Sequence, residues 1–92
     1  MSEDVIETTL EIQNRKGLHA RAAAAFVKAI ENINAEVMVE RLGHCVSGCS
    51  IMGLMMLAAS KGTNITIMAR GEQAQEAIDA LTHLINCKFG ED

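Results

Sequence analysis

Apolar and polar side chains alternate at the start of the chain, over residues 5–12. Ile6, Leu10 and Ile12 share one face of this segment, and polar residues occupy the positions that point the other way. A period of two residues is typical of a strand with one buried face. The same reasoning predicts three further strands, the first two joined by a turn at Leu42-Gly43: 35–41, 44–47 and 65–70.

Two other segments repeat their apolar residues every three or four positions, which is the period of an amphipathic helix. Over residues 20–32 the apolar stripe includes Phe26, whereas Arg21 and Lys28 fall together on the opposite, solvent-facing side. A final helix follows Gly71 and has an equally clear apolar stripe.

A short helix is predicted over residues 50–58, where Ser50 is a suitable N-cap because its hydroxyl accepts a hydrogen bond from the first turn. The predicted order of elements is therefore βαββαβα. We predict an α+β fold, a two-layer open-faced sandwich in which three helices lie on one face of a four-stranded, mainly antiparallel sheet. At 92 residues the chain is expected to form one domain that covers residues 1–92.

The chain is acidic overall, with a formal net charge of -4 at pH 7. This argues against nucleic acid as the main partner, because a nucleic-acid-binding domain presents a basic face. The interval between Ile12 and Ile30 contains no acidic residue and four basic ones: Arg15, Lys16, Arg21 and Lys28. Such local positive charge favours an anionic ligand or an acidic partner protein, with chance clustering as the alternative.

Export and membrane insertion are not expected. The first residues are acidic and lack the apolar stretch of a signal peptide, and the longest apolar run, residues 51–59, is too short to span a bilayer. Three cysteines, an odd number, fit no disulfide framework, so we expect a cytoplasmic protein whose thiols are buried and unpaired. A metal-binding module is the alternative, although the spacing differs from that of common zinc sites. Its ligands would come from this set: His44, Cys45, Cys49, His83 and Cys87.

His19 stands where the first predicted helix begins, in the segment GLHAR at residues 17–21. The first N–H groups of a helix lack internal partners and carry partial positive charge, which makes this position suitable for an anion. We expect the helix end to keep the imidazole neutral and nucleophilic, as in an unrelated enzyme that has a histidine at such a position. His19 is therefore predicted to accept a phosphoryl group covalently, with a helix cap or a packed core residue as the alternatives.

Neighbouring residues favour this chemistry. Gly17 permits a sharp bend and a close approach of the backbone, and the guanidinium of Arg21 can donate several hydrogen bonds to phosphoryl oxygens. The small side chains of Ala20, Ala22 and Ala23 are expected to leave the site open to another protein. A regulatory domain that binds a free anion at the same helix end is the alternative function.

The short helix is apolar on nearly every side, because residues 51–57 contain only isoleucine, leucine, methionine and one glycine. A small two-layer fold offers few fully enclosed positions for such a helix. We therefore expect an exposed apolar patch for a partner protein, formed by Ile51, Met52 and Met55, rather than a helix buried in the core. Ser50 is most simply the helix cap, although its phosphorylation would add about two negative charges beside this patch.

The segment GLHAR at residues 17–21, together with SIMGLMML at residues 50–57, resembles the HPr family, the histidine-containing phosphocarriers of the phosphoenolpyruvate-dependent phosphotransferase system. The resemblance covers nearly the whole chain. It implies that His19 accepts the phosphoryl group through Nδ1, with Arg21 as its companion. It also implies that Ser50 matches the serine that an ATP-dependent HPr kinase/phosphorylase modifies. The implied docking residues are Ile51, Met52 and Met55 of the apolar patch, and Lys28 lies at its rim.

The resemblance further implies that enzyme I, charged from phosphoenolpyruvate, donates the phosphoryl group and that enzyme IIA proteins accept it. The chain is then a stoichiometric carrier and not an enzyme, with no cofactor and no metal. Sugar transport and a nitrogen-type regulatory branch both stay open as its pathway. Two residues depart from the family pattern: Ala22 stands where a proline is frequent, and Cys49 where a lysine is frequent. Alanine leaves the first helical turn less rigid than proline does.

Overall fold

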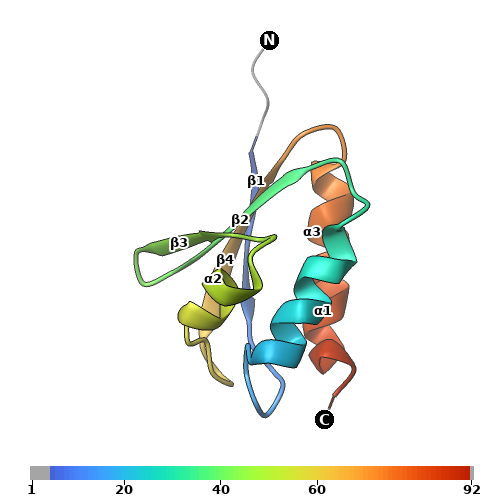
Figure 1. The fold of residues 1–92 in the computed structure, drawn as a ribbon. Coiled ribbons are helices and arrows are strands. Elements are labelled where there is room, and N and C mark those ends of the chain that lie inside the picture. Colours follow the sequence, from blue (N-terminus) through green and yellow to red (C-terminus); the bar gives the residue numbers. More distant parts are fainter. Residues whose placement is uncertain (1–4, 92) are drawn as a thin grey trace.

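The computed structural model describes residues 5–91, which form one sheet with three α-helices packed against it (Figure 1). A short 3-10 helix, η1, follows the last α-helix. The elements run in this order: β1 (Ile6–Glu11), α1 (Ala20–Ile30), β2 (Glu36–Arg41), β3 (His44–Ser47), α2 (Ile51–Met56), β4 (Asn64–Arg70), α3 (Ala74–Asn86) and η1 (Lys88–Gly90). The predicted α+β fold and its βαββαβα order are confirmed.

The sheet has the strand order β1-β4-β2-β3, and every neighbouring pair is antiparallel. β4 lies between β1 and β2, so Ile67 is paired with Thr8 on one side and with Val39 on the other. Alternate residues of β4 are fully buried, as expected for a central strand with one face against the helices.

Helix α1 has the predicted orientation, with Phe26 in the core and both Arg21 and Lys28 exposed. Ala22 and Ala23 are also fully buried, so they pack against the core and do not line an opening, contrary to our expectation. The helix ends at Ile30, two residues before the predicted limit, because the asparagine-rich segment 31–34 turns the chain toward β2.

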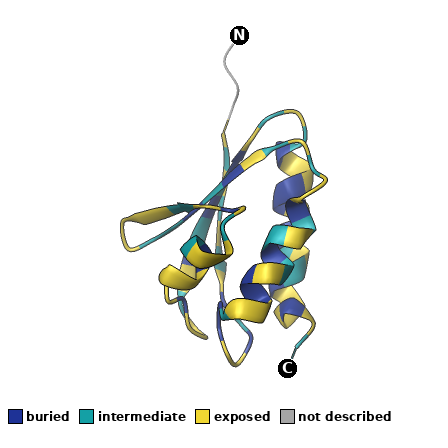
Figure 2. Cartoon of the chain, in the orientation of Figure 1, coloured by how far each residue is buried: buried dark blue, intermediate teal, exposed yellow. Residues whose placement is uncertain are grey.

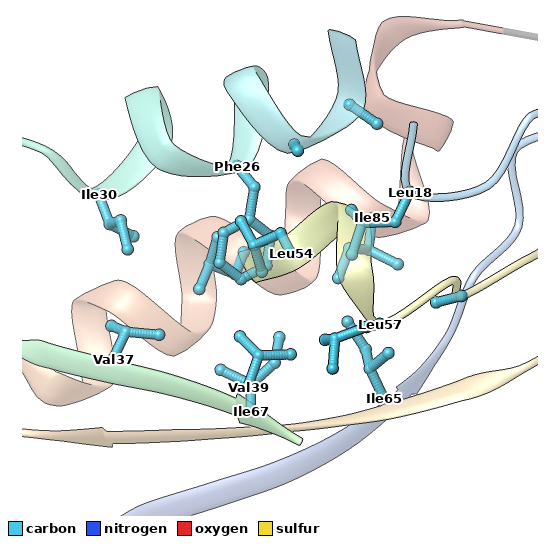
Figure 3. Packing of buried hydrophobic residues seen from close by; sticks show 14 of the residues in the cluster. Leu18, Phe26, Ile30, Val37, Val39, Leu54, Leu57, Ile65, Ile67 and Ile85 are labelled. Carbon is cyan, nitrogen blue, oxygen red and sulfur yellow. The ribbon is translucent and has the colours of Figure 1, made fainter. Parts of the chain in front are cut away.

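The core lies between the helices and the sheet. Phe26 of α1 and Leu54 of α2 meet above Val39 and Ile67 of the sheet (Figure 3). Burying one such side chain contributes about 1.5–3 kcal/mol to folding. Figure 2 shows that the buried side of each helix faces the sheet, while most of α2 is exposed.

The cysteines are not buried, which is a correction to the sequence analysis. Cys45 lies on the edge strand β3, Cys49 in the turn before α2, and Cys87 at the end of α3, and all three are exposed. These positions lie outside the core between the helices and the sheet, which aliphatic side chains fill. Within residues 5–91 no group of three or more metal-ligating side chains comes together. None of the helices described has the length and apolar character needed to cross a bilayer.

Candidate functional site

His19 is the N-cap residue of α1. Its backbone is extended, with φ -81° and ψ -177°, and its carbonyl oxygen accepts the first intrahelical hydrogen bond, 2.8 Å from the nitrogen of Ala23. The imidazole makes no capping hydrogen bond, so the ring is not used to close the helix. This excludes the simple cap that the sequence left open as an alternative, because a capping side chain accepts from the first turn.

The loop before His19 is held in place by two contacts with the segment after α2. The nitrogen of Leu18 donates a hydrogen bond to the carbonyl oxygen of Ala59 at 2.8 Å, and the Leu18 side chain is buried. Gly17 has φ 68°, and a Cβ there would lie 2.5 Å from the same Ala59 oxygen. Only glycine tolerates both conditions, so Gly17 allows the bend that presents His19 at the surface.

The imidazole contacts one carboxylate. Nε2 of His19 lies 2.7 Å from Oε2 of Glu91, and the two side chains are 27% and 19% exposed. Nδ1 has no hydrogen-bond partner among residues 5–91. The ring is therefore anchored at one nitrogen and free at the other, in a partly exposed position.

Asn14 holds this carboxylate from the other side. Its Nδ2 donates to Oε1 of Glu91 at 3.0 Å and to the carbonyl oxygen of Gly17 at 2.7 Å. The hydrogen bond from Asn14 is the main cause that lowers the pKa of Glu91, and the hydrogen bond and charge of His19 and the charge of Arg21 act in the same direction. Partial burial opposes them but does not reverse the shift. Glu91 is thus an ionised acceptor at neutral pH.

Three of the four basic residues predicted around His19 gather on this side of the molecule. Arg15, Lys16 and Arg21 line a surface hollow of about 330 Å³ together with Glu91. Lys16 also lines a second hollow, of about 190 Å³, whose wall includes His19. No ion pair joins any of these three cations to another of the residues that the structure describes. Positive charge is therefore available beside the imidazole for an anionic group.

Helix α2 presents the second predicted surface. Ile51, Met52 and Met55 are exposed as predicted, Met52 to 72%. Met56 is exposed to 78% and was missing from our prediction. We call these four side chains the α2 patch. Ser50 is the N-cap of this helix, where its Oγ accepts a hydrogen bond from the nitrogen of Gly53 at 2.9 Å.

The sequence matches a protein-family profile described as "PTS HPr component phosphorylation site" over residues 6–86. The chain belongs to the HPr family. It is 47% identical over 87 residues to the phosphocarrier protein HPr of Neisseria meningitidis, with 95% of this chain and 98% of that protein covered. It is 51% identical over 83 residues to the phosphocarrier protein HPr of Pseudomonas aeruginosa, with 89% and 92% covered. The crystal structure of HPr-C-His from Thermoanaerobacter tengcongensis superimposes with a TM-score of 0.90 at 44% identity, over 95% of this chain and 98% of that one.

The chain is therefore a phosphocarrier of the phosphotransferase system, which is a carrier protein and not itself an enzyme. The family resemblance drawn from the two motifs is confirmed. A phosphocarrier needs a nucleophile that another protein can reach.

Sequence reasoning missed two residues of this site, Asn14 and Glu91. Asn14 lies between the first predicted strand and the first predicted helix, and Glu91 lies in the last residues of the sequence. Glu91 is separated from His19 by 72 positions along the chain. No periodicity or local motif points to such a pairing, because it depends on how the chain returns after α3.

Proposed function

We propose that His19 carries the phosphoryl group of this phosphocarrier on its Nδ1 atom. The observation that supports this best is the state of the ring: Nε2 is engaged by Glu91, while Nδ1 has no partner among the described residues. The ring is partly exposed at the start of α1, where the free N–H groups of the first turn favour an anion. A partner protein can therefore reach the free nitrogen.

In the transfer, the lone pair of Nδ1 attacks the phosphorus atom, and the bond from phosphorus to the donor breaks with its electron pair leaving on the donor. Arg21 is exposed beside the site, and its guanidinium can donate to the oxygens of the moving group. We propose enzyme I, charged from phosphoenolpyruvate, as the donor and enzyme IIA proteins as the acceptors. The basic hollow beside His19 supports an acidic surface on both partners.

The α2 patch is proposed as the docking surface for these partners. A group of exposed methionines suits recognition of several proteins, because methionine is flexible and packs against varied shapes. Helices α1 and α2 pack against each other, and the segment after α2 contacts the loop that leads into His19. The helix that bears the patch is therefore packed next to the elements that present the imidazole. Lys28, exposed on α1, is proposed as a charged residue at its rim.

Ser50 is proposed as a site of regulatory phosphorylation by an HPr kinase/phosphorylase. Its hydroxyl begins α2, directly before the first residue of the α2 patch. A phosphate there would bring negative charge to a surface proposed to meet acidic partners, and so weaken docking. Incubation with the kinase and ATP should label the wild-type protein and leave Ser50→Ala unlabelled. Labelling of that variant would contradict the proposal.

The proposal for His19 is tested by incubation with enzyme I and phosphoenolpyruvate. We expect one acid-labile phosphate, mapped by mass spectrometry to the peptide that contains His19, and no label on His19→Ala. His44→Ala and His83→Ala are matched controls, because both histidines are exposed and distant in sequence from this loop. Equal labelling of His19→Ala would show that the site has been assigned wrongly.

A regulatory domain that binds a free anion is the second candidate, favoured by the hollow lined with Arg15, Lys16 and Arg21. Calorimetry with inorganic phosphate and with phosphoenolpyruvate, in the absence of enzyme I, separates the two functions. A carrier that gains its group by covalent transfer needs little affinity for the free anion, so we expect no measurable heat. Cytoplasmic location and a single domain over residues 1–92 stay predictions.

A further inference from the structure

We propose that Glu91 is a positioning residue that determines which nitrogen of His19 reacts. It holds the proton on Nε2, so that the lone pair lies on Nδ1, and it faces the positive charge that the ring acquires during transfer. This inference deepens the proposed function and rests on His19 being the phosphoryl acceptor. Three independent features of the structure support it.

The first feature is the hydrogen bond between the two side chains. An ionised carboxylate has no proton to donate, so it can only accept. Because Nε2 lies 2.7 Å from Oε2 of Glu91, Nε2 must carry the hydrogen in this contact. A neutral imidazole has one N–H and one lone pair, so the lone pair is then on Nδ1. The lowered pKa of Glu91, caused first by its bond from Asn14, keeps the carboxylate ionised well below neutral pH.

The second feature is that Glu91 is itself held in place. Each of its carboxylate oxygens has one partner, Oε1 with Asn14 at 3.0 Å and Oε2 with His19 at 2.7 Å. Asn14 is fully buried, and its Nδ2 also binds the carbonyl oxygen of Gly17 in the loop that presents the imidazole. One amide group therefore ties the carboxylate and the histidine loop together, as outer partners fix the orientation of metal-binding and catalytic histidines.

The third feature is the backbone that brings Glu91 to this position. Lys88, Phe89 and Gly90 all have positive φ, at 56°, 57° and 76°. This left-handed region is uncommon for residues other than glycine. The reversal is anchored because the Phe89 side chain is buried in the core and the nitrogen of Glu91 donates to the carbonyl oxygen of Lys88 at 2.9 Å. Figure 1 shows the result, in which the chain after α3 lies beside the start of α1.

The charge on the ring changes during transfer. When Nδ1 forms its bond to phosphorus, the Nε2 proton stays in place, so the ring becomes a cation. The carboxylate of Glu91 stands 2.7 Å from that proton and stabilises the cation, as the carboxylate of a catalytic triad stabilises its imidazolium. The other charged side chains that line the two hollows beside the ring are all positive: Arg15, Lys16 and Arg21. Glu91 is the one negative side chain in these linings, and it offsets the cation.

The test compares Glu91→Gln and Glu91→Ala with Glu7→Gln, which removes an equal charge from an exposed position on β1. With enzyme I and phosphoenolpyruvate, we expect kcat for phosphorylation of His19 to fall about tenfold in both Glu91 variants, as for loss of one charge-assisted hydrogen bond. KM for the carrier should stay unchanged, because Glu91 acts on the ring and not on docking. Glu7→Gln should behave as the wild type in both constants.

A spectroscopic measurement on the unphosphorylated protein distinguishes a positioning role of Glu91 from a purely structural role. Imidazole ¹⁵N spectra of the wild type should show the proton on Nε2 of His19, with that proton protected from exchange. In Glu91→Ala the protection should be lost, while the backbone amide spectrum away from the site stays unchanged.

The outcomes separate the inference from the proposed function. If His19 is phosphorylated in Glu91→Gln at the wild-type rate and the ¹⁵N spectrum is unaltered, the role of Glu91 is wrong and the assignment of His19 stands. If the phosphate on the wild-type protein maps to another residue, the assignment of His19 is wrong, and the proposed role of Glu91 in transfer is then wrong as well. A fall in kcat accompanied by an equal rise in KM would place Glu91 in docking and overturn the positioning role.

Discussion

The two surfaces proposed to function in this carrier are built in different ways. The His19 site joins three segments far apart in the sequence, and polar contacts from Asn14 and Glu91 hold it in one arrangement. The α2 patch comes from a single helix of six residues, and no hydrogen bond fixes its exposed side chains. The imidazole proposed to react is thus held in a defined orientation, whereas the surface proposed for recognition is free to adapt its packing.

This difference has a physical cause. Transfer of a phosphoryl group requires a lone pair in one direction, and hydrogen bonds are directional. Association through apolar contact has no such direction, and flexible methionines can cover partners of different shape. If the comparison holds, mutations at the His19 site should change the rate of phosphoryl transfer, and mutations at the α2 patch should change the affinity for partner proteins.

The largest effect is expected for His19→Ala, which should abolish phosphorylation and leave complex formation with enzyme I intact. The reason is that the α2 patch is separate from the imidazole that the mutation removes. Binding measured by NMR titration should stay within about twofold of the wild type, which is the range for side chains outside a hot spot. Loss of binding together with transfer would show that the two surfaces are not independent.

Arg21→Ala should slow transfer by about tenfold to a hundredfold, because it removes charge-assisted hydrogen bonds to the phosphoryl oxygens. Arg21 is exposed on α1, so the thermal midpoint of unfolding should stay unchanged. Rapid-quench kinetics and calorimetry measure the two quantities, and Lys61→Ala, another exposed cation, serves as the control. A collapse of the fold would contradict the exposed position of Arg21.

Helix α2 allows a buried side chain and an exposed side chain to be compared within one helix of six residues. Leu54 is fully buried and Met52 is 72% exposed. Leu54→Ala should lower the free energy of unfolding by about 2–5 kcal/mol, whereas Met52→Ala should change it by less than about 0.5 kcal/mol. Met52→Ala should instead weaken binding to enzyme I by about tenfold, as for loss of a central interface contact. Equal binding of Met52→Ala and wild type would remove Met52 from the docking surface.

The smallest effect is expected from pH. The pKa of Glu91 is lowered by its contacts, so the stability that it contributes is fully present above the ordinary glutamate pKa and is lost as pH falls through the lowered value. A ¹³C NMR titration of the Glu91 carboxyl should give a pKa below that of a free glutamate side chain.

The Asn14→Ala variant sharpens this measurement. Because the hydrogen bond from Asn14 is the largest cause of the shift, the variant should move the pKa of Glu91 back toward its ordinary value. An unchanged pKa would assign the shift to His19 and Arg21 alone.

Much of the fold was predictable because its signals are local. The pattern of apolar residues placed six elements within a few residues of their observed ends, and it placed the seventh, α3, after Gly71. The same periodicity predicted that Arg21 and Lys28 are exposed and that Phe26 is buried. The motif around His19 and the segment at residues 50–57 were enough to indicate the family, since both are continuous in the sequence.

The errors came from features without a local signal. The cysteines were expected to be buried from the general behaviour of free thiols, yet Cys45 and Cys87 occupy a strand edge and a helix end. Ala22 and Ala23 were expected near the opening because they are small, but small side chains also let α1 pack closely on the core. Residue type alone does not distinguish these environments.

The sequence by itself therefore determined the elements, their buried faces and the presence of a histidine at a helix start, since each depends on neighbours within a few positions. The tertiary structure decided which atoms meet His19. The contact between Glu91 and Nε2 exists only because the left-handed turn at residues 88–90 returns the chain to the start of α1. Asn14 then donates hydrogen bonds both to Glu91 and to Gly17 in the loop before His19. Contacts of this kind follow from the path of the whole chain, and no short stretch of residues encodes them.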